Sequence, residues 1–316
     1  MLLNLFESIP DIMGTDKQSI AFQGASNLLC KLQAMVARVR GLCYHEEEPP
    51  VNGISTTIPT STFPRDIVMP GGRHDNDNKD ITKIKIFPTE NEIRSGQAEF
   101  LPSADRDQPH FLADQSERHI DTQFRLFRHD VFGEPNDSLG GFLVAVDNEP
   151  ALLDSINPGL GGMRAYSYPR AHISYITFDR RRGLEAQISF PHPPQVRQKS
   201  TSDRRKWWED SSRLQEGVLL CFVFRHDAKS SIIFFTVSEK CTDAVRKYSL
   251  TSQQHHATIT AKLASYNQRE MDVMMKLSCE KTRGNLIEFP SILPSTFVPV
   301  LENLQSMQRL GRLPLA

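Results

Sequence analysis

The sequence has little cysteine and no long apolar run. Its five cysteines never occur as a CxxC pair, which excludes the usual zinc-ribbon and zinc-finger spacings. This cysteine usage predicts reduced thiols in an intracellular protein, nuclear or cytoplasmic. No apolar stretch approaches the roughly 20 residues that a membrane span needs. The N-terminus carries Glu7 and Asp11 where a signal peptide would begin with basic residues, so we expect no association with a membrane.

Common catalytic signatures are missing as well. There is no GxxxxGK[ST] loop for ATP phosphates, no HExxH or HxE…PCxxC zinc site and no GxSxG nucleophile elbow. The glycine-rich stretches 139–141 and 159–162 do not fit a phosphate-binding loop either. The adjacent His255 and His256 would point to opposite faces of a strand, so they would not share a metal ion. We therefore predict no catalytic residues, no cofactor and no metal.

Charges of opposite sign are segregated along the chain. Residues 83–163 contain 7 Lys+Arg and 14 Asp+Glu, a net charge of −7, whereas residues 164–250 contain 16 and 9, a net charge of +7. Such segregation predicts that the two parts dock on each other, or that the basic part binds a polyanion. Two solvated surfaces of opposite sign would give the same pattern.

The most distinctive basic segment is 197–224, RQKSTSDRRKWWEDSSRLQEGVLLCFVF. Serine and threonine at its start can cap a helix, and a glycine can end it. If that helix spans 200–215, Trp207 and Leu214 share a face, which predicts that Trp207 is more buried than Trp208. The apolar, β-branched and aromatic run that follows predicts a buried strand.

We predict an α+β fold in which a small antiparallel β-barrel or sandwich is flanked by N- and C-terminal helices. The candidate strands are 174–179, 184–190, 218–224, 232–238 and 256–264. Along the chain this gives an N-terminal helical segment, a disordered linker, a helical acidic segment, a basic barrel-like domain and C-terminal helices. The corresponding boundaries are 1–44, 45–82, 83–163, 164–265 and 266–316.

Local signals define three helices outside the barrel. A capping box of Thr89 and Glu92 begins the first. The second spans 115–132 and ends at Gly133 and Pro135. It would bury Ile120, Phe124, Phe127 and Val131, and expose Arg125, Arg128 and His129. The third is capped by Ser295 or Thr296, and its apolar stripe consists of Phe297, Val300, Leu301, Leu304 and Met307.

Several stretches carry a resemblance to a known family. They are FPTENEIRS from Phe87, FLPS from Phe100, HIDTQFRLFRHD from His119, FDRRRGLE from Phe178, WWEDSSRLQ from Trp207, LIEFP from Leu286 and LPSTFVPVLENLQSM from Leu293. In this order, over residues 84–316, they resemble the region that precedes the two RecA-like domains in fungal NFX-type zinc-finger-containing superfamily-one RNA helicases. These helicases are associated with small-RNA pathways, including RNA-directed RNA polymerase complexes and heterochromatin silencing.

The chain departs from that family in its chemistry. It contains neither the ATP-binding motifs nor the Cys-rich fingers, so no ATPase or helicase residue carries over. The resemblance implies a truncated product, a fragment of a longer helicase or a free-standing paralogue. We therefore expect a non-catalytic accessory region that guides single-stranded RNA near a helicase motor.

The candidate RNA contacts are cations, because Lys and Arg neutralise phosphates without exacting geometry. They are Arg180, Arg181, Arg182, Arg197, Lys199, Arg204, Arg205 and Lys206. Trp207 and Trp208 are predicted to be core or helix-docking residues rather than base-stacking ones.

The alternative is a protein-docking module that does not bind RNA. Its partner would be a helicase core or a silencing-complex protein. It would dock through the helix that contains Arg125 and Arg128, with Phe124 and Phe127 as structural residues, or through the stripe of the last helix around Phe297 and Leu301.

Overall fold

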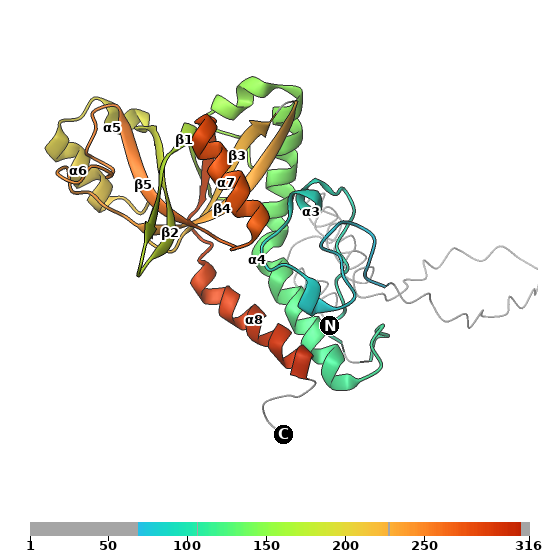
Figure 1. Cartoon of the computed structure of the whole chain (residues 1–316). Helices are drawn as coiled ribbons and strands as arrows, with labels where there is room; N and C mark the ends of the chain where they lie inside the picture. Colours follow the sequence, from blue (N-terminus) through green and yellow to red (C-terminus); the bar gives the residue numbers. More distant parts are fainter. Residues whose placement is uncertain (1–68, 106, 227, 311–316) are drawn as a thin grey trace, which may run out of the picture. The chain divides into compact units, whose positions relative to one another are not determined.

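Six antiparallel strands close into a barrel in the computed structural model, which describes residues 69–310 apart from 106 and 227. The strands are β1 Tyr166–Asp179, β2 Gly183–Pro191, β3 Leu219–His226, β4 Lys229–Glu239, β5 His256–Leu263 and β6 Gly284–Phe289. Their order around the barrel is β1-β2-β5-β4-β3-β6 (Figure 1). The predicted α+β class with an antiparallel barrel is confirmed.

Strand β3 explains why the sequence contains a continuous apolar run. Leu220 and Phe222 point into the barrel core, while Leu219, Cys221 and Val223 belong to a second core on the outer face. A strand that is buried on both faces lacks polar alternation and reads as unbroken hydrophobic sequence. The predicted strand 218–224 therefore lies between two apolar layers.

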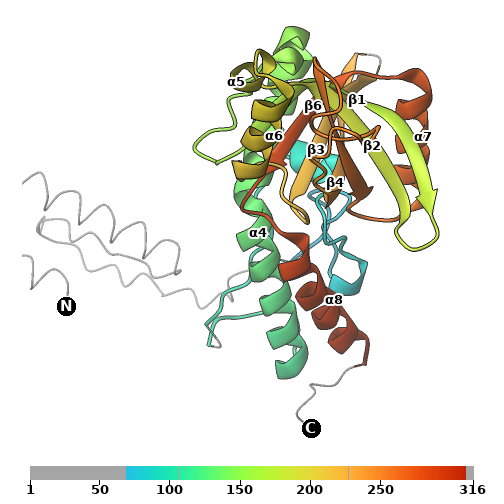
Figure 2. The ribbon, with the colours of Figure 1, turned by 90° about the vertical axis from the view of Figure 1, so that its left-hand side faces the viewer.

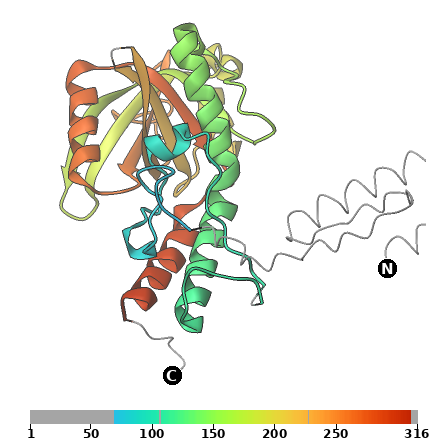
Figure 3. The same ribbon diagram turned by 90° about the vertical axis from the view of Figure 1, so that its right-hand side faces the viewer.

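Helices cover the outside and one end of the barrel. They are α3 Glu90–Arg94, α4 Gln115–Asn148, α5 Pro194–Arg197, α6 Thr201–Asp210, α7 Gln268–Glu280 and α8 Pro294–Leu310, with short 3₁₀ turns at Ile81–Lys83 and Pro150–Asp154. One half of α4 packs on the outer face of the barrel, and the other half lies beside α8 (Figures 1 and 3). The predicted capping box of Thr89 and Glu92 is confirmed at the start of α3.

The predicted end of the second helix at Gly133 and Pro135 is wrong, because α4 continues to Asn148. Its apolar face continues through Phe142 and Val146, which are buried against the barrel. Burying this face outweighs the local cost of glycine and proline in a helix. Gly140, within the predicted glycine-rich stretch, lets α3 approach closely: a Cβ there would lie 2.5 Å from the carbonyl oxygen of Ile93.

Two further predictions fail near the chain ends. Residues 266–316 are not all helical, because β6 occupies Gly284–Phe289 and closes the barrel between β1 and β3. Helix α8 begins at Pro294, so Ser295 and Thr296 lie in its first turn and do not cap it.

Part of the predicted linker is ordered. The side chain of Asn76 is buried, accepts a hydrogen bond from the backbone N–H of Lys85 at 2.7 Å and donates one to Glu92 Oε2 at 2.8 Å. The linker prediction is therefore wrong for residues 69–82. The helix predicted over 1–44 and the rest of the linker lie outside the described residues.

Candidate nucleic-acid interface

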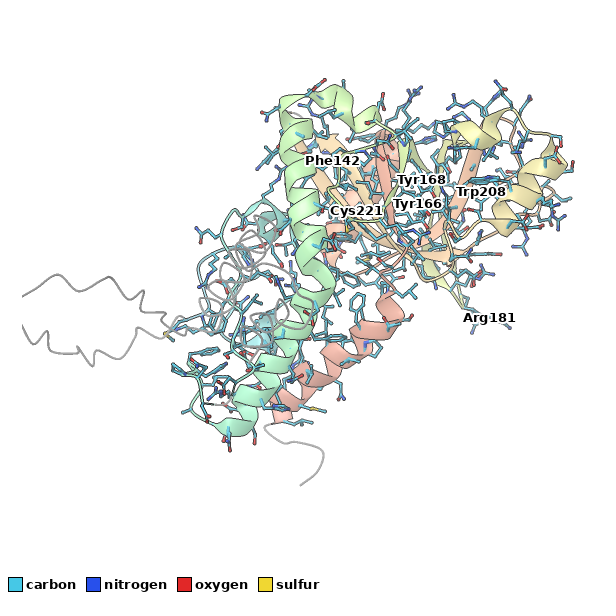
Figure 4. All side chains as sticks on the ribbon, turned by 180° about the vertical axis from the view of Figure 1, so that it is seen from behind. Phe142, Tyr166, Tyr168, Arg181, Trp208 and Cys221 are labelled. Carbon is cyan, nitrogen blue, oxygen red and sulfur yellow. The ribbon has the colours of Figure 1, made fainter. Side chains whose placement is uncertain are left out.

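The β1–β2 hairpin extends past the rest of the barrel and has three arginines at its end. Beyond Ala171, β1 pairs only with β2, and β2 pairs with β5 only from Ala186 onward. The end of the hairpin is therefore a two-stranded ribbon (Figure 2). Figure 4 shows Arg181 at this end, away from Trp208 of α6.

Sequence-local hydrogen bonds fix the turn. The carboxylate of Asp179 accepts the backbone N–H groups of Arg181 at 2.7 Å and Arg182 at 2.8 Å. Gly183 completes the turn with φ +78°, a conformation that favours glycine. Because the turn is held through the backbone, the exposed side chains of Arg180 and Arg181 remain available for other contacts.

Two tyrosines stack beside the hairpin. Tyr175 of β1 lies against Tyr248 of the β4–β5 connection, with ring centroids 5.9 Å apart and planes 11° from parallel. Lys247 Nζ lies 5.1 Å from the centroid of Tyr248. Tyr175 is 51% exposed, so its ring offers free surface to a ligand. Exposed aromatic rings next to cations are the surface on which single-stranded nucleic acids stack.

A carboxylate links the hairpin to the same connection. Glu239 forms ion pairs with both Arg182 and Arg246. The hydrogen bond from Arg182 is the main cause that lowers the pKa of Glu239, so this carboxylate is charged at neutral pH and offsets part of both arginine charges. Lys247 beside the stacked tyrosines, and Arg180 and Arg181 at the hairpin tip, form no ion pair with any residue that the structure describes.

Helix α6 contacts the β4–β5 connection near both of its ends, at Thr242 and at Gln254. Of the three predicted cap candidates in 200–202, Ser200 caps the helix by accepting the backbone N–H of Asp203. Arg205 pairs with Glu209 at 2.8 Å, and Glu209 also accepts a hydrogen bond from Thr242 at 3.1 Å. The connection thus contacts both the hairpin and α6. We use the name basic surface for the exposed cations of the hairpin, of residues 197–206 and of the connection: Arg180, Arg181, Arg182, Arg197, Lys199, Arg205, Lys206, Arg246 and Lys247.

Arg204 does not belong to this surface, contrary to the prediction. It is buried, and its guanidinium donates to the carbonyl oxygen of Gln254 at 2.7 Å and to Thr201 Oγ1 at 3.1 Å. Arg204 lies one helical turn before Trp208, and both face inward. Its role is to attach α6 to the β4–β5 connection.

The predicted order of burial of the two tryptophans is also wrong. Trp208 is fully buried and Trp207 only partly, because α6 ends at Asp210 and does not reach Leu214. Leu214 has φ +52°, outside any helix, and its backbone N–H donates to Glu288 Oε1 at 2.6 Å. Trp207 and Leu214 therefore share no helical face, although both tryptophans do have the predicted structural role.

The central residues of both predicted docking surfaces are buried within the chain. Arg125 is buried and bonded to Asp121 at 2.9 Å, and Arg128 is buried and bonded to Glu92 at 2.8 Å. The exposed cationic face predicted for this helix is thus wrong for both arginines. In the stripe of α8, Phe297 and Leu301 are buried in the outer core together with α4, and Leu304 and Met307 pack partly against it. Val300, which was predicted to belong to the stripe, is 46% exposed.

The acidic and basic parts do not neutralise each other through ion pairs. Among the Lys and Arg side chains that the structure describes, the one ion pair that joins residues 83–163 to residues 164–250 is Arg170–Asp154. Its atoms are 3.9 Å apart and both side chains are 60% exposed, so it is weak. Ion pairs with the acidic part therefore do not take up the positive charge of the barrel part.

One group of side chains has the spacing of metal ligands. His74, Glu92 and Glu99 offer ligand atoms that lie within 4.8 Å of one another. Arg128 bonds both carboxylates, Glu92 at 2.8 Å and Glu99 at 3.2 Å. Burial raises the pKa of Glu92, but the charge and hydrogen bonds of Arg128 outweigh burial and leave it below its usual value. A guanidinium thus already supplies the positive charge that a metal ion would bring.

A cavity of about 890 Å³ lies between the segment around α3, strand β4 and the start of α7. Its lining contains four Lys and Arg residues and four acidic residues, the latter being Asp75, Glu90, Glu270 and Glu302. This balance of charge does not select a class of ligand.

Sequence reasoning missed the aromatic half of the interface. Tyr175 and Tyr248 lie far apart in the chain and meet only through the barrel. A usable signal was present, because each tyrosine lies close to a basic run, SYITFDRRR for Tyr175 and RKY for Tyr248.

Comparisons with known proteins add no family to this description. No protein-family model matches the chain, and no curated protein matches it. Among the described residues, no helix combines the length and the apolar character that crossing a membrane requires.

Proposed function

We propose that this chain binds single-stranded RNA through the basic surface, without sequence preference and without catalysis. In this proposal the barrel guides RNA beside an RNA-helicase motor of a small-RNA silencing pathway. The sequence resemblance supports the choice of RNA and of the pathway, and the geometry of the basic surface supports the mode of binding.

The observation that carries the proposal is the exposed tyrosine stack, with Lys247 beside it and two arginines at the tip of the same hairpin that form no ion pair among the described residues. Tyr175 and Tyr248 present aromatic surface, and Arg180, Arg181 and Lys247 present charge that no carboxylate of the described residues takes up. Stacking tolerates any base, and phosphate contacts carry no sequence information. The arrangement supports weak, sequence-independent binding.

The protein-docking alternative has less support. The arginines of α4 and the centre of the α8 stripe, where a partner would dock, are both buried within the chain. The basic surface has no such cover among the described residues, so RNA is the better-supported ligand.

The test is a fluorescence-anisotropy titration of a labelled single-stranded RNA at two salt concentrations. Each neutralised phosphate contributes about −0.7 to the log–log salt slope, so engaging about four of them gives a slope near −3. Reversing Arg180, Arg181 and Lys247 to Glu should abolish binding, and the fold should survive because all three side chains are exposed.

The matched control reverses three exposed cations outside the basic surface, Lys79, Lys83 and Arg309. This variant has the same net charge as the Arg180/Arg181/Lys247 variant, so it controls for the general electrostatic effect of reversing three charges. It should bind RNA within about twofold of wild type. Equal binding by wild type and the Arg180/Arg181/Lys247 variant would refute the proposal and favour protein docking.

A further inference from the structure

The β1–β2 hairpin has an aromatic side chain on each of its two faces. Successive residues of a strand point to opposite faces, so Tyr175 and Thr177 share one face while Ile176 and Phe178 share the other. Ile176 packs against the barrel core, and so does Leu184, the cross-strand partner of Phe178. Phe178 lies past this core and is 80% exposed.

Nothing in the described part of the chain covers the ring of Phe178. An exposed aromatic ring on a projecting ribbon offers a face on which a nucleic-acid base can stack. Its neighbours in the turn are Arg180 and Arg181, which form no ion pair among the described residues. The ligand that fits both features has flat apolar faces and a negatively charged backbone.

We infer that this hairpin is a wedge that binds where a nucleic-acid duplex opens into two single strands. The inference rests on the proposed function and names its preferred substrate. Phe178 stacks on the end of the duplex, and the Tyr175–Tyr248 pair on the other face receives a base of one separated strand. Arg180 and Arg181 contact the phosphates that diverge at the tip.

A forked junction combines two features that neither a single strand nor a blunt duplex offers together. It exposes the flat face of a terminal base pair, and it provides single strands on both sides of an inserted ribbon. Apolar side chains that enter a base step unstack it at a cost, and that cost is lowest where the stack already ends. The two aromatic faces of the hairpin match the two strands of a fork.

The test compares three RNAs that share one labelled strand: the single strand, a blunt duplex and a forked duplex. Anisotropy titrations with the full chain in the same buffer should show the fork bound about fivefold or more tightly than the single strand, the lower end of what one base–aromatic stack supplies. Phe178→Ala should lose this preference, while its affinity for the single strand stays within about twofold. Val144→Ala, which removes another exposed apolar side chain on α4, is the matched control and should keep it.

A second readout reports on stacking itself. A 2-aminopurine base in the last pair before the fork should change its fluorescence on binding wild type and not on binding Phe178→Ala. Because Phe178 is exposed, the variant should keep the thermal midpoint of wild type, which excludes misfolding as a cause.

The outcomes separate the wedge from the proposed function. If wild type binds the single strand but does not prefer the fork, or if Phe178→Ala keeps the preference, the wedge is overturned and the basic surface stands. If wild type binds none of the three RNAs, the proposed function fails first, and Phe178 is then assigned to an apolar protein partner.

Discussion

Trp208 is the aromatic residue that fastens α6 to the barrel. It is fully buried and meets the ring of Phe190 edge-on, with centroids 6.4 Å apart, while Trp207 is partly exposed. We expect Trp208→Ala to lower the free energy of unfolding by about 3–5 kcal/mol. Trp207→Ala should cost clearly less. Urea unfolding of both variants measures the difference, and equal midpoints would contradict this assignment.

The sequence contained too little to decide between these two neighbours. Which tryptophan faces the core depends on where α6 ends and on how Leu214 is held, and Leu214 is held by Glu288 of β6. Arg204 is likewise buried through a bond to Gln254, far along the chain. Ser200 and the Thr89–Glu92 capping box were predicted correctly because their partners are three residues away. At the residue scale, local contacts were predictable and distant ones were not.

At the scale of single elements, α4 contains two adjacent glycines in opposite surroundings. A Cβ at Gly140 would lie 2.5 Å from the backbone oxygen of Ile93, whereas one at Gly141 would meet nothing within 4 Å. Alanine favours a helix over glycine by about 1 kcal/mol. Gly141→Ala should therefore raise the thermal midpoint, and Gly140→Ala should lower it because α3 must move. If both variants shifted the thermal midpoint in the same direction, α3 would be able to move away from a Cβ at Gly140 without a loss of stability.

The strands were more predictable than the lengths of the helices. Period-two patterning and apolar runs locate β2, β3, β4 and β5 within a few residues of their ends. Strand β6 is six residues long and follows a helix, so its sequence fits a helical region until its two neighbours in the barrel are known. The continuation of α4 through Pro135 was also unpredictable from local sequence. Packing of its apolar face on the barrel stabilises a helix that local propensity alone would end.

At the scale of the whole molecule, the Glu92–Arg128 pair fastens the segment around α3 to α4. Both side chains are buried, so removing one partner leaves the other charge poorly compensated. We expect Glu92→Gln to lower the free energy of unfolding on the order of 3 kcal/mol at neutral pH. Urea unfolding of wild type and Glu92→Gln measures this difference.

The same pair predicts how that difference depends on pH. Since the pKa of Glu92 is lowered in the folded state, the unfolded chain takes up this proton first as pH falls below about 4.5. The stability that Glu92 provides is therefore present above that pH and is lost below it. The difference in free energy of unfolding between wild type and Glu92→Gln should be constant from pH 7 to 5 and shrink toward pH 3. A gap that widens on acidification would contradict the folded-state pKa.

The hairpin has a consequence that does not depend on any ligand. Residues 172–179 of β1 and 183–185 of β2 each pair with one neighbouring strand, so the outer edges of this ribbon have no strand partner among the described residues. Unpaired strand edges are templates for aggregation, and natural proteins guard them with charge. Three consecutive arginines at the tip make two such ribbons repel each other. The residues that we assign to RNA would thus also protect the protein's solubility, whether or not RNA is bound.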